Sequence, residues 1–361
     1  MGRDDLHEGF SSIQPFAGAS FPTEDLFSST RQFFDDGNTS SLMRLTSIEI
    51  CAGAGGQALG LEQAGFRHVA LIEIEGSACT TLRLNRPQWN VIEGDVHEFR
   101  GEPYRGVDLL AGGVPCPPFS KAGKQLGTQD ERDLFPEAIR LVDEIKPRAI
   151  MIENVRGLLD PVFATYRQEI KRNLQELGYR SEWKLLNARD FGVPQLRPRA
   201  ILVGFQSEIS DLFVWPAQSG LKSATVGESL FDLMASNGWK GVAAWRTIAS
   251  EIAPTLVGGS KKHGGPDLGP TRAKKAWAAL GVDGKGIANE APAADFEGMP
   301  KLTTRMTARL QGFPDSWQFF GKKTAAYRQI GNAFPPPVAH AVGRQIARCL
   351  QAGSQIASRV A

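Results

Sequence analysis

Short apolar runs alternate with amphipathic stretches from Leu45 to about residue 206. Helical spacing predicts helices over 131–145 and 161–177, the first ended by Pro147 and the second capped by Gly178. The apolar runs have the length of strands and lie at 45–50, 69–74, 107–110, 149–152, 182–186 and 200–203. This alternation is typical of βαβ units and predicts an α/β fold with a mostly parallel sheet.

The pattern changes after Gln206. About 100 residues rich in Gly, Trp and Lys follow, which predicts an inserted second domain. Helical spacing returns at Val338, Val342, Ile346 and Leu350, after a stop at the three prolines 335–337. We therefore expect an N-terminal extension (1–44), a first domain (45–205), a smaller inserted domain (206–322) and a C-terminal return to the first domain (323–361).

The first 44 residues show no sustained period and carry seven acidic and three basic side chains. This composition predicts a poorly ordered extension, although phenylalanines at 10, 16, 21, 27, 33 and 34 leave a docking role open. The remainder holds 38 basic and 32 acidic side chains. This mild excess permits nucleic-acid binding and is equally compatible with an ordinary surface.

The four cysteines, at positions 51, 79, 116 and 349, are too few and too scattered for a disulfide framework. The opening residues lack the basic and apolar regions of a signal peptide, and no apolar run reaches the roughly 18 residues of a membrane span. We expect a cytoplasmic protein with no membrane partner.

A glycine-rich turn, Cys51-Ala52-Gly53-Ala54-Gly55-Gly56, follows the first predicted strand and leads into a helix. Glycines let a ligand approach the backbone closely, and such a turn binds adenosine-type cofactors without specifying which. Glu73 ends the second strand about 20 residues later, where a carboxylate accepts both ribose hydroxyls. Asp95 follows a third short strand, where it can accept from an adenine amino group. A surface acid is the simpler interpretation of either residue alone.

Cys116 lies between two prolines just past the apolar run that ends near Leu110. A cysteine that only fills a core has no need of this setting, so a nucleophilic thiolate is the alternative that we favour.

Six motifs in this order resemble those of the DNA cytosine-5 methyltransferases of prokaryotic restriction-modification systems, over nearly all of residues 45–350. They are the glycine turn, Pro115-Cys116, Glu153-Asn154-Val155, Gln195-Leu196-Arg197-Pro198-Arg199, Arg309-Leu310-Gln311-Gly312-Phe313-Pro314 and Gln329-Ile330-Gly331-Asn332. The resemblance implies a Rossmann-like methyltransferase domain with an inserted target-recognition domain. It also implies S-adenosylmethionine as cofactor, S-adenosylhomocysteine as its product, and no metal.

The resemblance assigns roles to four catalytic residues. Cys116 would add to C6 of a cytosine and make C5 enamine-like, and Glu153 would act as an acid at N3. Arg199, with Arg197, would hold O2 and order the pocket; an ordinary surface ion pair is the alternative. No side chain is an obvious base for the C5 proton, and water is a candidate. The cytosine has to be flipped out of the duplex to reach these groups.

The resemblance also implies cofactor and DNA contacts. The expected cofactor-binding residues are Cys51, Ala52, Gly53, Gly55, Gly56, Glu73, Ile74, Asp95, Val96, Gly113, Pro115, Leu134, Asn332 and Ala333. The expected contacts to duplex DNA are Ser120, Lys124, Gln125, Thr255, Lys261, Lys262 and Arg272, the last three in a stretch with a local excess of positive charge. A mobile surface loop is the alternative interpretation of 120–127.

Other functions remain open at this point. An RNA cytosine-5 methyltransferase of the same fold is the nearest alternative, followed by a nicotinamide oxidoreductase and a catalytically silent DNA-binding module. Adenine-N6 and cytosine-N4 methylation are disfavoured because no Asp-Pro-Pro-Tyr or Ser-Pro-Pro-Tyr type motif occurs. We expect a monomer, with a cognate restriction endonuclease acting separately as a possible partner.

Overall fold

A computed structural model describes residues 44–115, 133–206, 208–218, 220, 222–259 and 265–360. Arg44–Ala361 forms one compact unit. The expectations for the N-terminal extension, for Cys116, and for Ser120, Lys124, Gln125, Lys261 and Lys262 lie outside the described residues. No helix in the described part of the chain has both the length and the apolar character needed to cross a membrane.

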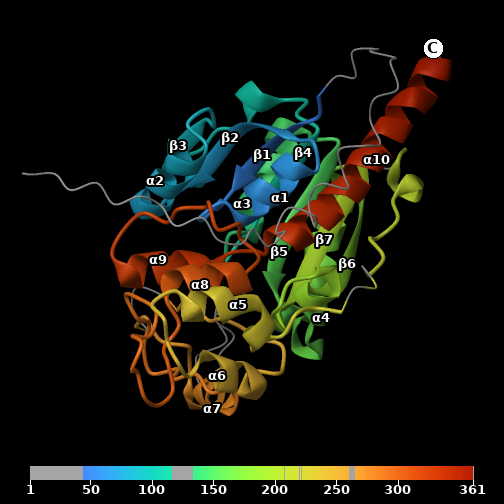
Figure 1. Cartoon of the computed structure of the whole chain (residues 1–361). Helices are drawn as coiled ribbons and strands as arrows, with labels where there is room; N and C mark the ends of the chain where they lie inside the picture. The colour runs from blue at the N-terminus through green and yellow to red at the C-terminus, as the bar shows by residue number, and fades with distance from the viewer. Residues whose placement is uncertain are drawn as a thin grey trace, which may run out of the picture. The chain divides into compact units, whose positions relative to one another are not determined.

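A seven-stranded sheet forms the centre of this unit (Figure 1). Its order is β3-β2-β1-β4-β5-β7-β6, and the first five of these strands run parallel. β7 runs antiparallel to both of its neighbours. The bounds are β1 Thr46–Ile50, β2 Arg67–Glu73, β3 Val91–Glu93, β4 Leu109–Gly112, β5 Ala149–Val155, β6 Tyr179–Asn187 and β7 Pro198–Gln206. The predicted α/β fold with a mostly parallel sheet is confirmed.

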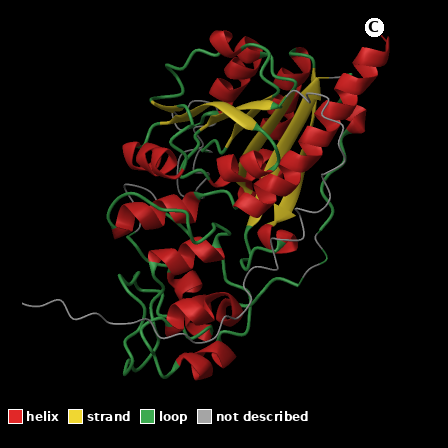
Figure 2. Cartoon of the chain, turned by 45° about the horizontal axis from the view of Figure 1, so that its top comes forward, coloured by secondary structure: helices red, strands yellow, loops and turns green. Residues whose placement is uncertain are grey.

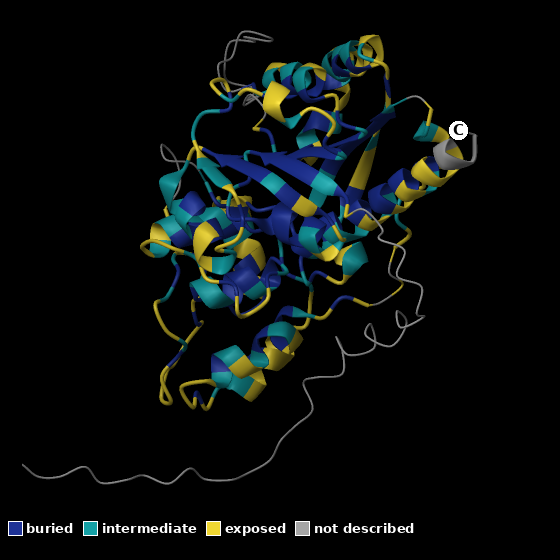
Figure 3. Cartoon of the chain, turned by 90° about the horizontal axis from the view of Figure 1, so that it is seen from above, coloured by how far each residue is buried: buried dark blue, intermediate teal, exposed yellow. Residues whose placement is uncertain are grey.

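Helices cover both faces of the sheet because successive strand residues point to opposite sides. Along β5, Met151 packs into one apolar cluster with α1 (Gly56–Gln63) and α10 (Pro336–Val360). Ile150 and Ile152 pack into the other cluster, with α3 (Phe135–Ile145) and α4 (Ala164–Glu176). α2 (Gly76–Asn85) packs against β2 and β3. Helices lie on both sides of the sheet (Figure 2), and the central strands β1, β4, β5 and β7 are largely buried between them (Figure 3). The edge strands β3 and β6 keep exposed residues.

The helix predictions hold except near the ends. Within the predicted 161–177, Pro161–Phe163 forms a 3-10 turn before α4 begins, and Gly178 follows with φ 90°. The predicted stop is present, since Ala333, Phe334 and Pro335 are not helical, but α10 begins within the three prolines, at Pro336, and not after them. Proline is tolerated in a first helical turn, where its missing N–H would have no intrahelical partner.

Residues 222–333 add five helices and no strand within the part that the structure describes. An apolar cluster of their own contains Trp239, Trp245 and Trp277. A further apolar cluster packs Ala308, Phe313 and Trp317 against Ala52 of the glycine turn and Leu59 of α1. The helices are α5 Val226–Ala235, α6 Val242–Ile248, α7 Thr271–Ala279, α8 Thr304–Leu310 and α9 Lys323–Asn332. The boundaries of an inserted domain stay a prediction.

Candidate active site

A cavity of about 620 Å³ opens at the edge of the sheet where the parallel strands end. Ligands of open α/β sheets bind at this edge, where the strand order reverses, here between β1 and β4. Ten of the predicted site residues line the cavity: Cys51, Gly53, Glu73, Gly113, Pro115, Glu153, Arg197, Arg199, Thr255 and Asn332. Residues from sequence positions 51 to 332 thus converge on one space.

The glycine turn after β1 has three left-handed residues, Cys51 (φ 52°), Gly53 (φ 54°) and Gly55 (φ 84°). A Cβ on Gly53 would meet no atom of the described residues within 4 Å, so this backbone faces space that those residues leave open. A Cβ on Gly55 would lie 2.7 Å from a Leu82 methyl carbon, and one on Gly56 would lie 2.2 Å from the Phe334 carbonyl oxygen. Gly53 therefore leaves room for a ligand, whereas Gly55 and Gly56 permit close packing of protein on protein.

The Glu73 carboxylate is fixed at the end of β2 by two backbone N–H groups. The Gly53 N–H donates to Oε2 at 2.7 Å, and the Glu75 N–H donates to Oε1 at 2.8 Å. Burial raises the pKa of Glu73, and these two hydrogen bonds oppose the shift. Each oxygen keeps a second lone pair with which it can accept from a hydroxyl group.

Glu49, one residue before the end of β1, is fully buried, and its Oε2 has no hydrogen-bond partner among the described residues. Burial, followed by the charge of Glu73, raises its pKa well above the usual range. A carboxyl whose pKa is higher in the folded state binds its proton more tightly there. Glu49 therefore destabilises the fold progressively as pH rises from the ordinary carboxyl pKa through its raised value.

We expect Glu49→Gln to raise the thermal midpoint of the cofactor-free protein by about 5 °C at pH 8, because the amide never carries the buried charge. The difference should shrink toward pH 5, where Glu49 is protonated. Calorimetry from pH 5 to pH 8 measures this, with exposed Glu98→Gln as control. An equal pH dependence in wild type and Glu49→Gln would contradict the assignment.

Glu153 and Arg199 form a buried ion pair on the cavity wall. β5 and β7 pair in antiparallel register, which brings the two residues together, and Arg199 Nε lies 2.7 Å from Glu153 Oε1. Both side chains are almost buried, at 11% and 12% exposure. Burial raises the pKa of Glu153, while Arg199 and then Arg197 oppose the shift. A proton on Glu153 is thus retained to higher pH than on an ordinary glutamate.

Arg197 is fully buried and bonds to backbone carbonyls. Its Nη1 donates to the Leu256 carbonyl at 2.8 Å, and its Nη2 donates to those of Gly331 and Ala333 at 2.7 and 3.0 Å. Its Nε has no hydrogen-bond partner in the part of the chain that the structure describes. Gln195 strengthens the same junction by accepting from the Leu256 N–H at 2.9 Å. Arg197 thus ties β7 to the 255–258 segment and to the end of α9.

Asn154 holds the backbone that leads to Cys116. Its Nδ2 donates to the Val114 carbonyl oxygen at 2.9 Å, and the contact is buried. Val114 and Pro115 line the cavity beside Glu153. Sequence reasoning quoted Asn154 within a motif but gave it no role.

The other predicted cofactor residues do not line this cavity. Ala52 and Ala333 are buried in packing, Val96 is buried behind the third strand, and Leu134 is half-buried just before α3. Ile74 is 61% exposed, and Asp95 stands on a half-exposed loop. Arg272 is exposed on α7. The structure therefore separates residues that face the cavity from residues that shape or border it.

Sequence reasoning missed Trp317, which buttresses the glycine turn. Its Nε1–H donates to the Ala54 carbonyl at 3.1 Å, and its ring lies against Gly55. It also missed Arg328 and Gln329, which line the cavity from α9. Gln329 belongs to a quoted motif, whereas no local pattern around Trp317 signals a contact 263 residues away.

The sheet order and the cavity at the strand ends define an α/β enzyme of the type that binds a nucleoside cofactor beside a glycine turn. The sequence model of the C-5 cytosine-specific DNA methylase family matches residues 45–348. The chain belongs to that family, and it is an enzyme, a DNA cytosine-5 methyltransferase. The RNA-directed alternative is not favoured.

Among similar proteins, the Type II methyltransferase M.NgoMIV of Neisseria gonorrhoeae is 62% identical over 312 residues, covering 86% of this chain and 99% of the relative. The Type II methyltransferase M.NaeI of Lentzea aerocolonigenes is 56% identical over 315 residues, covering 86% of this chain and 76% of the relative. A solved structure of a putative DNA modification methyltransferase from an Escherichia coli prophage has the same fold, with a TM-score of 0.58 at 22% identity. It covers 85% of this chain and 99% of its own.

Proposed function

We propose that this enzyme methylates C5 of a flipped-out cytosine in a specific duplex sequence, through a covalent bond between Cys116 Sγ and C6. The observation that carries the proposal is the single cavity that joins Pro115, the Glu153–Arg199 pair and the Gly53–Glu73 turn. Cofactor groups and base-binding groups have to meet in one space for group transfer.

S-adenosylmethionine fits the residues of the turn and supplies an electrophilic methyl group when it is bound. Open space over Gly53 accommodates the ligand, and Glu73, held by two backbone N–H groups, can accept the ribose hydroxyls. Ile74 offers an exposed apolar surface for a flat ring. Asp95 can accept from an adenine amino group. Among the described residues, no group of three or more His, Cys, Asp or Glu side chains forms a metal site.

The thiolate of Cys116 attacks C6, and electron density moves toward N3. Glu153 donates its proton to N3 and so stabilises the adduct, which its raised pKa supports. Arg199 holds Glu153 in place and directs positive charge toward O2. Arg197 orders the cavity wall through its carbonyl contacts. After transfer the C5 proton leaves, for which water is our candidate acceptor; the Cys116 thiolate is then eliminated, and the N3 proton returns to Glu153, which gives neutral 5-methylcytosine.

Residues 206–322 recognise the target sequence in this proposal. Thr255 lines the cavity and is anchored by its Oγ1–H to the Leu196 carbonyl at 2.5 Å, and Arg272 is exposed for a phosphate contact. Ser120, Lys124, Gln125, Lys261 and Lys262 are further proposed DNA contacts. Because the relatives are Type II methyltransferases, we propose a role in restriction-modification. The nuclease partner, the cytoplasmic location and the monomeric state stay predictions.

The test uses labelled S-adenosylmethionine with unmethylated duplex DNA and with tRNA. We expect label in DNA as 5-methylcytosine, and bisulfite sequencing should locate it at one recurring sequence. Label confined to tRNA, or recovered at an exocyclic amino group, would contradict the proposal.

A further inference from the structure

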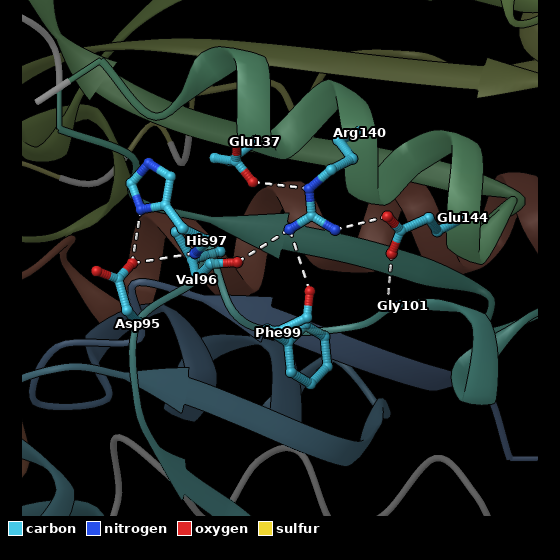
Figure 4. Close-up of polar contacts among 8 residues, drawn as sticks. All are labelled: Asp95, Val96, His97, Phe99, Gly101, Glu137, Arg140 and Glu144. Atoms are coloured by element: carbon cyan, nitrogen blue, oxygen red, sulfur yellow. Dashed lines mark hydrogen bonds and ion pairs between the residues drawn. The ribbon is translucent and has the colours of Figure 1, made fainter. Parts of the chain in front are cut away.

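Arg140, in the middle of α3, uses all three of its guanidinium nitrogens (Figure 4). Nε donates to Glu137 at 2.7 Å and Nη1 donates to Glu144 at 2.6 Å. Nη2 donates to the backbone carbonyls of Val96 and Phe99 at 3.0 and 3.1 Å. The two glutamates fix the orientation of the guanidinium, which leaves one nitrogen directed at the loop after β3.

Glu144 adds a further attachment between α3 and the same loop. Its second oxygen accepts from the Gly101 N–H at 2.7 Å. A Cβ on Gly101 would lie 2.7 Å from an Ile145 side-chain carbon, so glycine permits the close approach to the helix. The loop between β3 and residue 101 is thereby attached to α3 at two carbonyls and one N–H, all of them backbone groups.

The attached loop carries Asp95, whose carboxylate is itself oriented (Figure 4). The His97 N–H donates to Asp95 Oδ1 at 3.0 Å, and His97 Nδ1 lies 2.7 Å from the same oxygen. Among the described residues, the two contacts from His97 are therefore made to the same carboxylate oxygen of Asp95, Oδ1. Arg140 holds the carbonyls of Val96 and Phe99 on either side of His97, and so fixes the residue that orients Asp95.

We propose that Arg140 is a positioning residue for cofactor selection, which holds the Asp95 loop so that Asp95 recognises the amino group of adenine. The inference rests on the proposed S-adenosylmethionine site. Arg140 itself contacts no cofactor in this arrangement. A merely structural role would change stability but would leave the discrimination between cofactor bases intact.

The test measures the dissociation constants of S-adenosylhomocysteine and S-inosylhomocysteine by titration calorimetry. The inosyl analogue replaces the adenine amino group with a carbonyl oxygen, which the Asp95 carboxylate should repel. Wild type should prefer the adenosyl ligand by about 10- to 100-fold. We expect Arg140→Met, which keeps the apolar stem, to weaken the adenosyl ligand about tenfold and the inosyl ligand less than threefold.

Arg148→Met is the matched control. Arg148 also binds a carboxylate and a backbone carbonyl, Asp108 and Leu350, but it precedes β5 at the opposite end of the sheet. Arg148→Met should leave the selectivity ratio unchanged, which is the dissociation constant of the inosyl ligand divided by that of the adenosyl ligand. If Arg140→Met fails to fold, Arg140→Lys, which cannot make all four contacts from one ammonium group, should still lower the ratio.

The variant Asp95→Asn distinguishes a failure of the positioning role of Arg140 from a failure of the adenine contact itself. A lowered ratio in Asp95→Asn with wild-type ratios in both Arg140 variants would overturn the positioning role alone. A wild-type ratio in Asp95→Asn would overturn the adenine contact and the inference built on it. No binding of S-adenosylhomocysteine to wild type would overturn the proposed cofactor site.

Discussion

Replacing Cys116 by alanine is expected to lower methyl transfer by about 10⁴-fold or more, because without the thiolate C5 of cytosine stays too electron-poor to accept a methyl group. Binding of duplex DNA should stay within about tenfold of wild type, since the thiol adds to the base only after the complex has formed. Single-turnover transfer of labelled methyl groups and a gel-shift titration measure the two quantities.

Cys349→Ala is the control for this variant. Cys349 is buried in α10, where its Sγ contacts the Ile209 carbonyl, and it lies in the apolar cluster on the α1–α10 face. It should retain turnover near the wild-type value. Turnover of Cys116→Ala close to that of Cys349→Ala would mean that another group activates the cytosine.

Glu153→Gln should lower turnover by about 10²- to 10⁴-fold, because the amide has no carboxyl proton to give to N3. The amide oxygen can still accept from Arg199 Nε, so the wall of the cavity should survive. Affinity for S-adenosylhomocysteine should remain within about threefold of wild type. Rapid-quench kinetics and calorimetric titration measure these effects.

Glu182→Gln provides the comparison for Glu153→Gln, since Glu182 accepts a hydrogen bond from Trp215 on the exposed side of β6. Its turnover should match wild type. If Glu153→Gln loses cofactor binding together with turnover, then Glu153 maintains the structure of the cavity and is not the acid at N3.

Local sequence patterns predicted the elements of the fold whose position depends on hydrophobic periodicity. Strand and helix periods located the strands and the helices α3 and α4, because burial on two faces requires nearly continuous apolar runs such as Ala149–Ile152. The break before α10 was predicted, but the start of the helix was placed after the three prolines, since the residue that breaks a helix interior is favoured in its first turn, as at Pro336. The antiparallel direction of β7 was not predicted, because strand direction depends on the connection and not on the strand's own residues.

The residues of the candidate site also differ in how far the sequence predicts them. Residues that contact a ligand, such as Glu73 and Glu153, follow strand ends and are recognisable in short motifs. Residues that hold those motifs in place are not, since Arg140, Asn154 and Trp317 act on backbone groups 40 to 263 positions away. Arg197 was predicted to hold O2 and to order the pocket; the structure directs its terminal nitrogens to three carbonyls, and its contact with the base stays a prediction. Only tertiary packing reveals these contacts.

The most direct test of the covalent mechanism uses duplex DNA copied with 5-fluorocytosine in place of cytosine, which contains the target whatever its sequence. Fluorine cannot leave C5 as a proton does, so the Cys116 adduct should persist after methyl transfer. We predict a complex that survives denaturation in detergent, with peptide mapping that places the nucleotide on Cys116. Methylation of ordinary DNA without any such complex, or an adduct on Cys51 or Cys79, would contradict the mechanism.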